Sequence, residues 1–123
     1  MPVKHKHSCR AIIVHCIDFR LTQFLNKWVE TAVSGGFDRL AIAGGVKNLP
    51  FVLDQIKLSK SLHGIKEVYL INHEECGAYG EAGTFEKHRA DLIKSKKITL
   101  EKYPDLTVFL LFLNLDGSFN WVY

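Results

Sequence analysis

The chain has 123 residues, enough for one domain with its own buried core. Hydrophobic residues make up 47% of the sequence and charged residues 24%, which is typical of globular proteins and argues against disorder. The formal net charge is only +3 and the basic residues are scattered, so we expect no nucleic-acid partner. The sequence contains no run of about 20 apolar residues, so we expect no membrane span.

The first residues and the cysteines indicate the cellular setting. The N-terminus shows no apolar signal core, so we do not expect secretion. The three cysteines, Cys9, Cys16 and Cys76, are too few and odd in number for a disulfide framework. We therefore expect a cytoplasmic protein with a disordered tail at residues 1–9 and a single domain at residues 10–123.

Strand and helix patterns alternate after this tail. Ala11–Cys16 is short and rich in Ile and Val, which is typical of a buried strand. An amphipathic helix follows and ends at Gly35-Gly36. Its apolar residues recur at helical spacing: Leu21, Phe24, Leu25, Trp28, Val29 and Ala32. Arg39–Ala43 is predicted to be the second strand, and Gly44-Gly45 follows it directly.

The rest of the chain continues the alternation. Asn48 is predicted to cap a helix that carries Pro50 in its first turn, and Gly64 is typical of its end. A charged helix is expected from about Thr84 into the nineties. The remaining predictions are the strand Glu67–Asn72, a glycine-rich loop at Gly77–Gly83, the strand Leu106–Leu113 and a short last strand at Phe119–Tyr123.

This order predicts an α/β fold with a mostly parallel four-stranded sheet, helices on both faces and room for a short fifth edge strand. Such sheets bind ligands beyond the carboxyl ends of their strands. Cys16 ends the first predicted strand, Gly44-Gly45 follows the second and His73 follows the third. These residues are therefore expected at one edge of the sheet.

The residue types at this edge indicate a metal. Zinc favours thiolate and imidazole ligands, and a catalytic zinc site typically has three protein ligands and one open position. His73 and Cys76 are three residues apart, so a tight turn can direct both toward one point, and Cys16 would supply a third ligand. The sequence therefore predicts a Zn²⁺ site formed by Cys16, His73 and Cys76.

Asp18 and Arg20 are two residues apart and can point the same way in an extended segment. A guanidinium can hold a carboxylate through two parallel hydrogen bonds, which fixes its direction and keeps it ionised. Such an aspartate beside zinc can orient the hydroxide formed from metal-bound water.

These two motifs, Cys-x-Asp-x-Arg and His-x-x-Cys-Gly, resemble the signature of β-class carbonic anhydrases, and the likeness extends over about residues 10–83. The resemblance implies an α/β fold and reversible hydration of carbon dioxide to bicarbonate. It implies that Cys16, His73 and Cys76 bind zinc, and that Asp18 and Arg20 form the orienting dyad. In some members the matching aspartate becomes a fourth zinc ligand and closes the site.

The likeness also covers Ala43-Gly44-Gly45, where the family has Ala-Gly-Asn. It therefore places Gly44 and Gly45 beside a small-molecule substrate, with Gly45 in place of the usual asparagine. The sequence is shorter than most members, and we expect it to lack their helical N-terminal arm. A homodimer or larger homo-oligomer is nevertheless expected from the family and from the large apolar residues at 119–123.

Other residues near the site have simpler interpretations. His15 should point to the opposite face of its strand from Cys16 and pack there. Glu74 and Glu75 are expected to be solvated loop charges, and His88 a surface histidine. Three alternative functions remain: hydrolysis of carbonyl sulfide or carbon disulfide, a non-catalytic zinc protein closed by Asp18, and thiol redox chemistry.

Overall fold

A computed structural model describes residues 7–123. Its centre is a five-stranded sheet in the order β2-β1-β3-β4-β5, of which the first four strands are parallel and β5 is antiparallel to β4. The strands are β1 (Ala11–His15), β2 (Phe37–Ala41), β3 (Glu67–His73), β4 (Thr107–Leu113) and β5 (Phe119–Trp121). The predicted mostly parallel sheet with a short fifth edge strand is confirmed.

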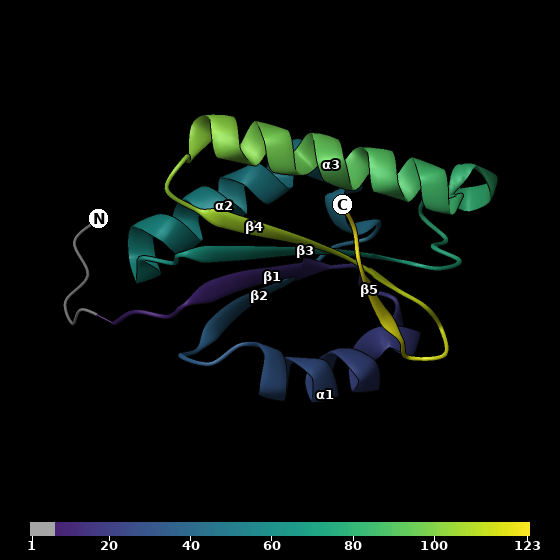
Figure 1. The fold of residues 1–123 in the computed structure, drawn as a ribbon, viewed down its shortest axis with the longest axis horizontal. Coiled ribbons are helices and arrows are strands. Elements are labelled where there is room, and N and C mark those ends of the chain that lie inside the picture. The colour runs from purple at the N-terminus through teal and green to yellow at the C-terminus, as the bar shows by residue number, and fades with distance from the viewer. Residues whose placement is uncertain (1–6) are drawn as a thin grey trace.

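Helices cover both faces of this sheet, as predicted (Figure 1). α1 (Thr22–Ala32) lies on one face, and α2 (Leu49–His63) and α3 (Phe85–Lys102) lie on the other. Three short 3₁₀ helices join the main elements: η1 (Phe19–Leu21), η2 (Gly45–Asn48) and η3 (Gly80–Ala82). None of the helices in residues 7–123 is long and apolar enough to cross a membrane.

The strand pattern explains the two cores. Successive side chains of a strand point to opposite faces, so a strand covered on both sides is apolar throughout. On β1, Ile12 and Val14 pack with Ile56 of α2 and Leu92 of α3, whereas Ile13 packs with the core under α1. The continuous Ile and Val run of β1 is therefore required on both sides of the sheet.

Turn residues set the helix ends. Pro50 lies in the first turn of α2, and Gly64 ends this helix with φ +61°, a left-handed conformation that glycine adopts without a steric penalty. Asn48 occupies the predicted cap position without a capping hydrogen bond from its side chain. Thr84 caps α3 by accepting a hydrogen bond from the Lys87 N–H.

The second strand is shifted from its predicted place. β2 begins at Phe37, two residues before the predicted start at Arg39, and ends at Ala41. The Arg10 N–H donates to the carbonyls of Gly35 and Gly36, and this contact sets Phe37 opposite Ala11. The glycine turn, which also has positive φ angles, therefore determines the register of β2.

Residues 1–6 of the predicted tail lie outside the described residues. Residue 9, which the prediction also assigned to the tail, is held by the fold: the Cys9 N–H donates to the His63 carbonyl at 3.1 Å. At the opposite edge of the sheet, β1 and β3 end at His15 and His73. The two predicted metal-binding motifs therefore begin on neighbouring strand ends, as expected for parallel strands.

Candidate metal centre

Three buried side chains meet at the carboxyl edge of the sheet. Cys16 directly follows β1, His73 is the last residue of β3, and Cys76 lies in the turn after it. One potential ligand atom from each lies within 4.8 Å of the others. Cys16 Sγ and Cys76 Sγ are 4.0 Å apart, and both cysteines are free. The structure thus brings together the three residues that the sequence selected.

The two ring nitrogens of His73 have different surroundings. Nδ1 lies 2.7 Å from the Glu74 carbonyl oxygen, so Nδ1–H donates and Nε2 retains its lone pair. Nε2 is fully buried and has no hydrogen-bond partner among the described residues. Metal-binding histidines typically donate their second N–H to a carbonyl or carboxylate in this way. An orphaned imidazole nitrogen beside two thiols therefore fits Zn²⁺ as its ligand.

The two thiols differ in acidity. Burial raises the pKa of Cys16, but a protonated His73 ring beside it and the Gly44 N–H, which donates to Cys16 Sγ at 3.3 Å, lower it to about 7. Burial and the neighbouring Cys16 raise the pKa of the Cys76 thiol. Metals bind thiolates, and the Gly44 N–H stabilises the thiolate form of Cys16.

Asp18 and Arg20 form the expected two-pronged pair. Arg20 Nη2 lies 2.7 Å from Asp18 Oδ2, and Arg20 Nε lies 3.1 Å from Asp18 Oδ1. The hydrogen bond from Arg20 lowers the pKa of Asp18 to about 2. Arg20 also donates to the carbonyl of Glu75 at 3.1 Å, which ties the Cys16 segment to the Cys76 turn.

The pair borders the candidate metal site. Asp18 Oδ2 lies 3.9 Å from His73 Nε2, the orphaned nitrogen. A pocket of about 690 Å³ opens at this point to solvent. Its lining combines three charged residues, Asp18, Arg20 and Glu75, with small or apolar ones: Cys16, Ile17, Phe19, Ala43, Gly77 and Ala78.

The two predicted substrate-binding glycines are buried beneath this pocket and are not among the residues that line it. Gly44 has φ +83° and donates its N–H to Cys16 Sγ. Gly45 has φ +59°, and a Cβ there would lie 2.5 Å from Asn72 Oδ1. Gly44 therefore contacts Cys16, and Gly45 lies against Asn72, the residue before His73.

A buried polar network behind the site was missed from the sequence. Asn72 Nδ2 lies 2.9 Å from His88 Nδ1 and 3.1 Å from the Tyr79 hydroxyl, which donates to Asp91 at 2.8 Å. The prediction that His88 is a surface histidine is wrong, because its side chain is fully buried. The buried face of α3 includes His88, Ser95 and Thr99, so hydrophobic periodicity gave little sign of it.

The other neighbours behave as predicted. His15 is buried and accepts a hydrogen bond from Arg39 Nε at 2.8 Å, so it packs and pairs away from the three-ligand cluster. Glu74 and Glu75 are exposed. Glu74 accepts a hydrogen bond from the Leu115 N–H, and Glu75 lies 3.6 Å from Arg20 Nη1.

Comparison with known proteins gives consistent results. A family model described as "putative carbonic anhydrase" matches residues 6–123. Two uncharacterized proteins, from Rickettsia bellii and Rickettsia conorii, are each 28% identical over 141 aligned positions, covering 98% of this chain and 86% and 76% of theirs.

Solved structures with the same fold include a carbonic anhydrase from Streptococcus mutans, with 23% identity, a TM-score of 0.63 and coverage of 99% of this chain and 88% of that one. The β-carbonic anhydrase isoform I of Trichomonas vaginalis has 17% identity, a TM-score of 0.67 and coverage of 99% and 87%. The chain therefore belongs to the family described as putative carbonic anhydrases and has the α/β fold of β-carbonic anhydrases.

Proposed function

We propose that this protein holds one Zn²⁺ through Cys16, His73 and Cys76 and catalyses the reversible hydration of carbon dioxide. The observation that carries the proposal is the buried, orphaned Nε2 of His73, which lies with two free thiols and next to the Asp18–Arg20 pair. Membership of the carbonic anhydrase family supports the same reaction.

The donor set suits zinc and leaves a position for chemistry. Two thiolates and one neutral imidazole are ligands that zinc prefers, and three protein ligands are typical of a catalytic site. A zinc ion held by these three residues would lower the pKa of water bound to it to about 7 and so would supply a nucleophile at neutral pH.

Asp18 orients the attacking water in this proposal. Its carboxylate is ionised and can only accept hydrogen bonds, and Arg20 fixes its direction through both oxygens. Arg20 is in turn held by the Glu75 carbonyl, so the carboxylate cannot rotate freely toward the ligand cluster. The chain thus uses Arg20 to keep Asp18 available as an acceptor.

The pocket suits a small apolar substrate. Ile17 and Phe19 are 62% and 84% exposed at its rim, and Ala43 and Ala78 add small apolar surface. Carbon dioxide carries no charge and offers only weak acceptors, so these apolar walls suit it, and the charged lining residues Asp18, Arg20 and Glu75 pair with one another.

The decisive experiment replaces Arg20 with Ala. Because Arg20 is not a metal ligand in this proposal, zinc content should stay unchanged. Carbon dioxide hydration, measured by stopped flow, should fall by roughly a hundredfold, because Asp18 loses its fixed direction. Arg10→Ala is a matched control, since Arg10 pairs with Glu67 at 3.1 Å at the other edge of the sheet.

Three outcomes separate the alternatives. Equal hydration by wild type and Arg20→Ala would make the dyad merely structural. Zinc-loaded wild type that hydrolyses carbonyl sulfide or carbon disulfide but does not hydrate carbon dioxide would identify the related activity. Wild type with full zinc and neither activity would favour a non-catalytic protein in which Asp18 closes the site, which its 3.9 Å distance from His73 Nε2 would permit.

A further inference from the structure

A second group of potential ligands lies at the amino edge of the sheet, away from the first. Within residues 7–123, Cys9, Asp38 and His63 form the one other cluster with potential ligand atoms within 4.8 Å of one another. Cys9 precedes β1, Asp38 lies in β2, and His63 is the last residue of α2. Three segments far apart in the sequence therefore converge at this edge.

The backbone fixes the relative positions of these residues. The Cys9 N–H donates to the His63 carbonyl at 3.1 Å, which joins the start of the chain to the end of α2. A Cβ on Gly36 would lie 3.3 Å from Cys9 Cβ, so Cys9 also sits close to the start of β2. The cluster is thus built by the fold and does not depend on flexible side chains alone.

The side chains of Asp38 and His63 are joined by a hydrogen bond. Asp38 Oδ2 lies 2.7 Å from His63 Nδ1 and accepts a hydrogen bond from the Ser59 hydroxyl at 2.6 Å. Ser59 therefore orients the carboxylate, as partners behind metal ligands commonly do. Ligands of tetrahedral zinc lie roughly 3.3 to 3.8 Å apart, so a small rotation of Asp38 and His63 would admit a metal in place of the proton.

Charge and access also suit a cation. One thiolate and one carboxylate would neutralise a divalent ion, and His63 lies at the C-terminus of α2, where the helix dipole favours positive charge. Asp38, Ser59 and His63 line a pocket of about 220 Å³, so an ion can enter from solvent.

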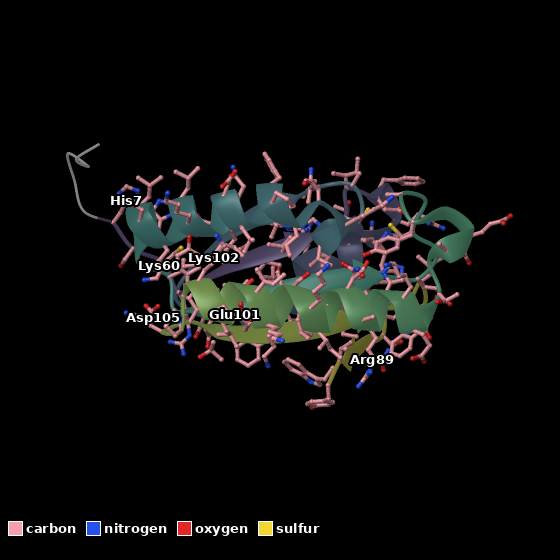
Figure 2. All side chains as sticks on the ribbon, turned by 90° about the horizontal axis from the view of Figure 1, so that it is seen from above. His7, Lys60, Arg89, Glu101, Lys102 and Asp105 are labelled. Carbon is pink, nitrogen blue, oxygen red and sulfur yellow. The ribbon has the colours of Figure 1, made fainter. Side chains whose placement is uncertain are left out.

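A second imidazole ring, that of His7, lies next to the cluster. The ring of His7 stands 4.7 Å from the ring of His63, centroid to centroid. Figure 2 shows His7 at the end of the molecule that also carries Lys60 and Asp105. Four protein ligands (Cys, Asp and two His) would fill all four positions of a tetrahedral zinc ion. A zinc ion with four protein ligands is typical of a structural site and not of a catalytic one.

We propose that Cys9, Asp38 and His63, with His7 as the fourth ligand, form a second Zn²⁺ site that clamps the N-terminal segment to the end of α2 and the start of β2. The site is independent of the proposed hydration reaction. This site is more exposed to solvent than the first cluster, because Cys9, Asp38 and His63 are only partly buried. We therefore expect it to bind zinc more weakly.

The test counts metal on the full chain. Wild-type protein stripped by a chelator and dialysed against Co²⁺, a spectroscopic substitute for zinc, should bind two equivalents. Cys9→Ser and Asp38→Asn should each weaken only the second equivalent, by at least about a hundredfold, since even indirect changes near metal sites cost ten- to a hundredfold. Asp54→Asn is the matched control, because Asp54 is an exposed carboxylate of α2 outside the cluster. It should bind both equivalents.

The outcomes separate this site from the first. A single equivalent that Cys16→Ser abolishes and Cys9→Ser leaves intact would overturn the second site. A second equivalent that persists in both Cys9→Ser and Asp38→Asn would overturn it as well. A single equivalent lost in Cys9→Ser but kept in Cys16→Ser would support the second site and contradict the proposed function. A misfolded variant would lose both equivalents, so selective loss of one cannot come from unfolding.

Discussion

Gly45 shows how a single backbone position can limit the site. It has φ +59°, and a Cβ there would lie 2.5 Å from the Asn72 amide oxygen and 3.1 Å from the Ile71 carbonyl oxygen. The Val46 N–H donates to the same Asn72 oxygen. An asparagine at this position, which is usual in β-class carbonic anhydrases, would compete with Asn72 for the same space. The contact with Asn72 therefore explains why glycine occupies position 45.

We predict that Gly45→Ala destabilises the fold much more than Gly64→Ala. Both glycines have φ near +60°, but nothing lies within 4 Å of a Cβ at Gly64. Gly64→Ala should lose about 1 to 2 kcal/mol of unfolding free energy from the left-handed conformation. Gly45→Ala should lose a further 1 to 3 kcal/mol or so, about the usual cost of overpacking, from its contact with Asn72. Urea denaturation measures both, and equal losses would show that Asn72 moves aside freely.

At the scale of elements, α3 buries polar side chains, and one of them, His88, lies beside Asn72 behind the metal centre. His88 lies between Tyr79, with ring centroids 4.0 Å apart, and Phe112, at 5.4 Å. Its Nε2 is buried without a hydrogen-bond partner among the described residues. Burial lowers the pKa of His88 to about 4, below its usual value of 6.5, so the ring is neutral in the folded protein at pH 7.

This buried histidine predicts a specific pH dependence of stability. Between pH 6.5 and 4 the unfolded chain binds a proton at His88 that the folded chain does not, so the unfolding free energy should fall as the pH falls through this window. The loss should reach about 2 kcal/mol between pH 7.5 and pH 5. His88→Leu should lack this pH dependence, so its unfolding free energy should fall by about 2 kcal/mol less than that of the wild type over the same pH range. Parallel curves for the two proteins would contradict a neutral, buried His88.

At the scale of the whole molecule, the C-terminal strand leaves aromatic surface uncovered. Val122 is buried and Phe119 stacks on Trp28 with centroids 5.1 Å apart, so these two are covered within the chain. Trp121 and Tyr123 remain 52% and 85% exposed. Large exposed aromatic side chains often mark an interface between subunits.

We propose a homodimer that uses this strand. Light scattering at micromolar concentration should give twice the mass of the chain, and the double variant Trp121→Ser, Tyr123→Ser should give a single chain. Leu58→Ser is the control, since Leu58 is 50% exposed on α2 and its loss should leave the dimer intact. A wild-type mass of one chain would contradict the proposal.

The sequence by itself determined the fold class and the residues of the first cluster. Parallel strands with helical crossovers place every strand end at one edge, so a cysteine after the first strand and His73 after the third must become neighbours. Gly35 and Gly36 after α1 and Gly64 at the end of α2 were also predictable, because few residues other than glycine adopt a positive φ.

Only the tertiary structure decided the remaining features. The register of β2 depends on the contact between Arg10 and the Gly35-Gly36 turn. The burial of His88 depends on how α3 lies on β3 and β4, because a polar helix face carries no hydrophobic period. Cys9, Asp38 and His63 meet only because a chain start, a strand and a helix end share one edge, and no spacing in the sequence encodes that distance.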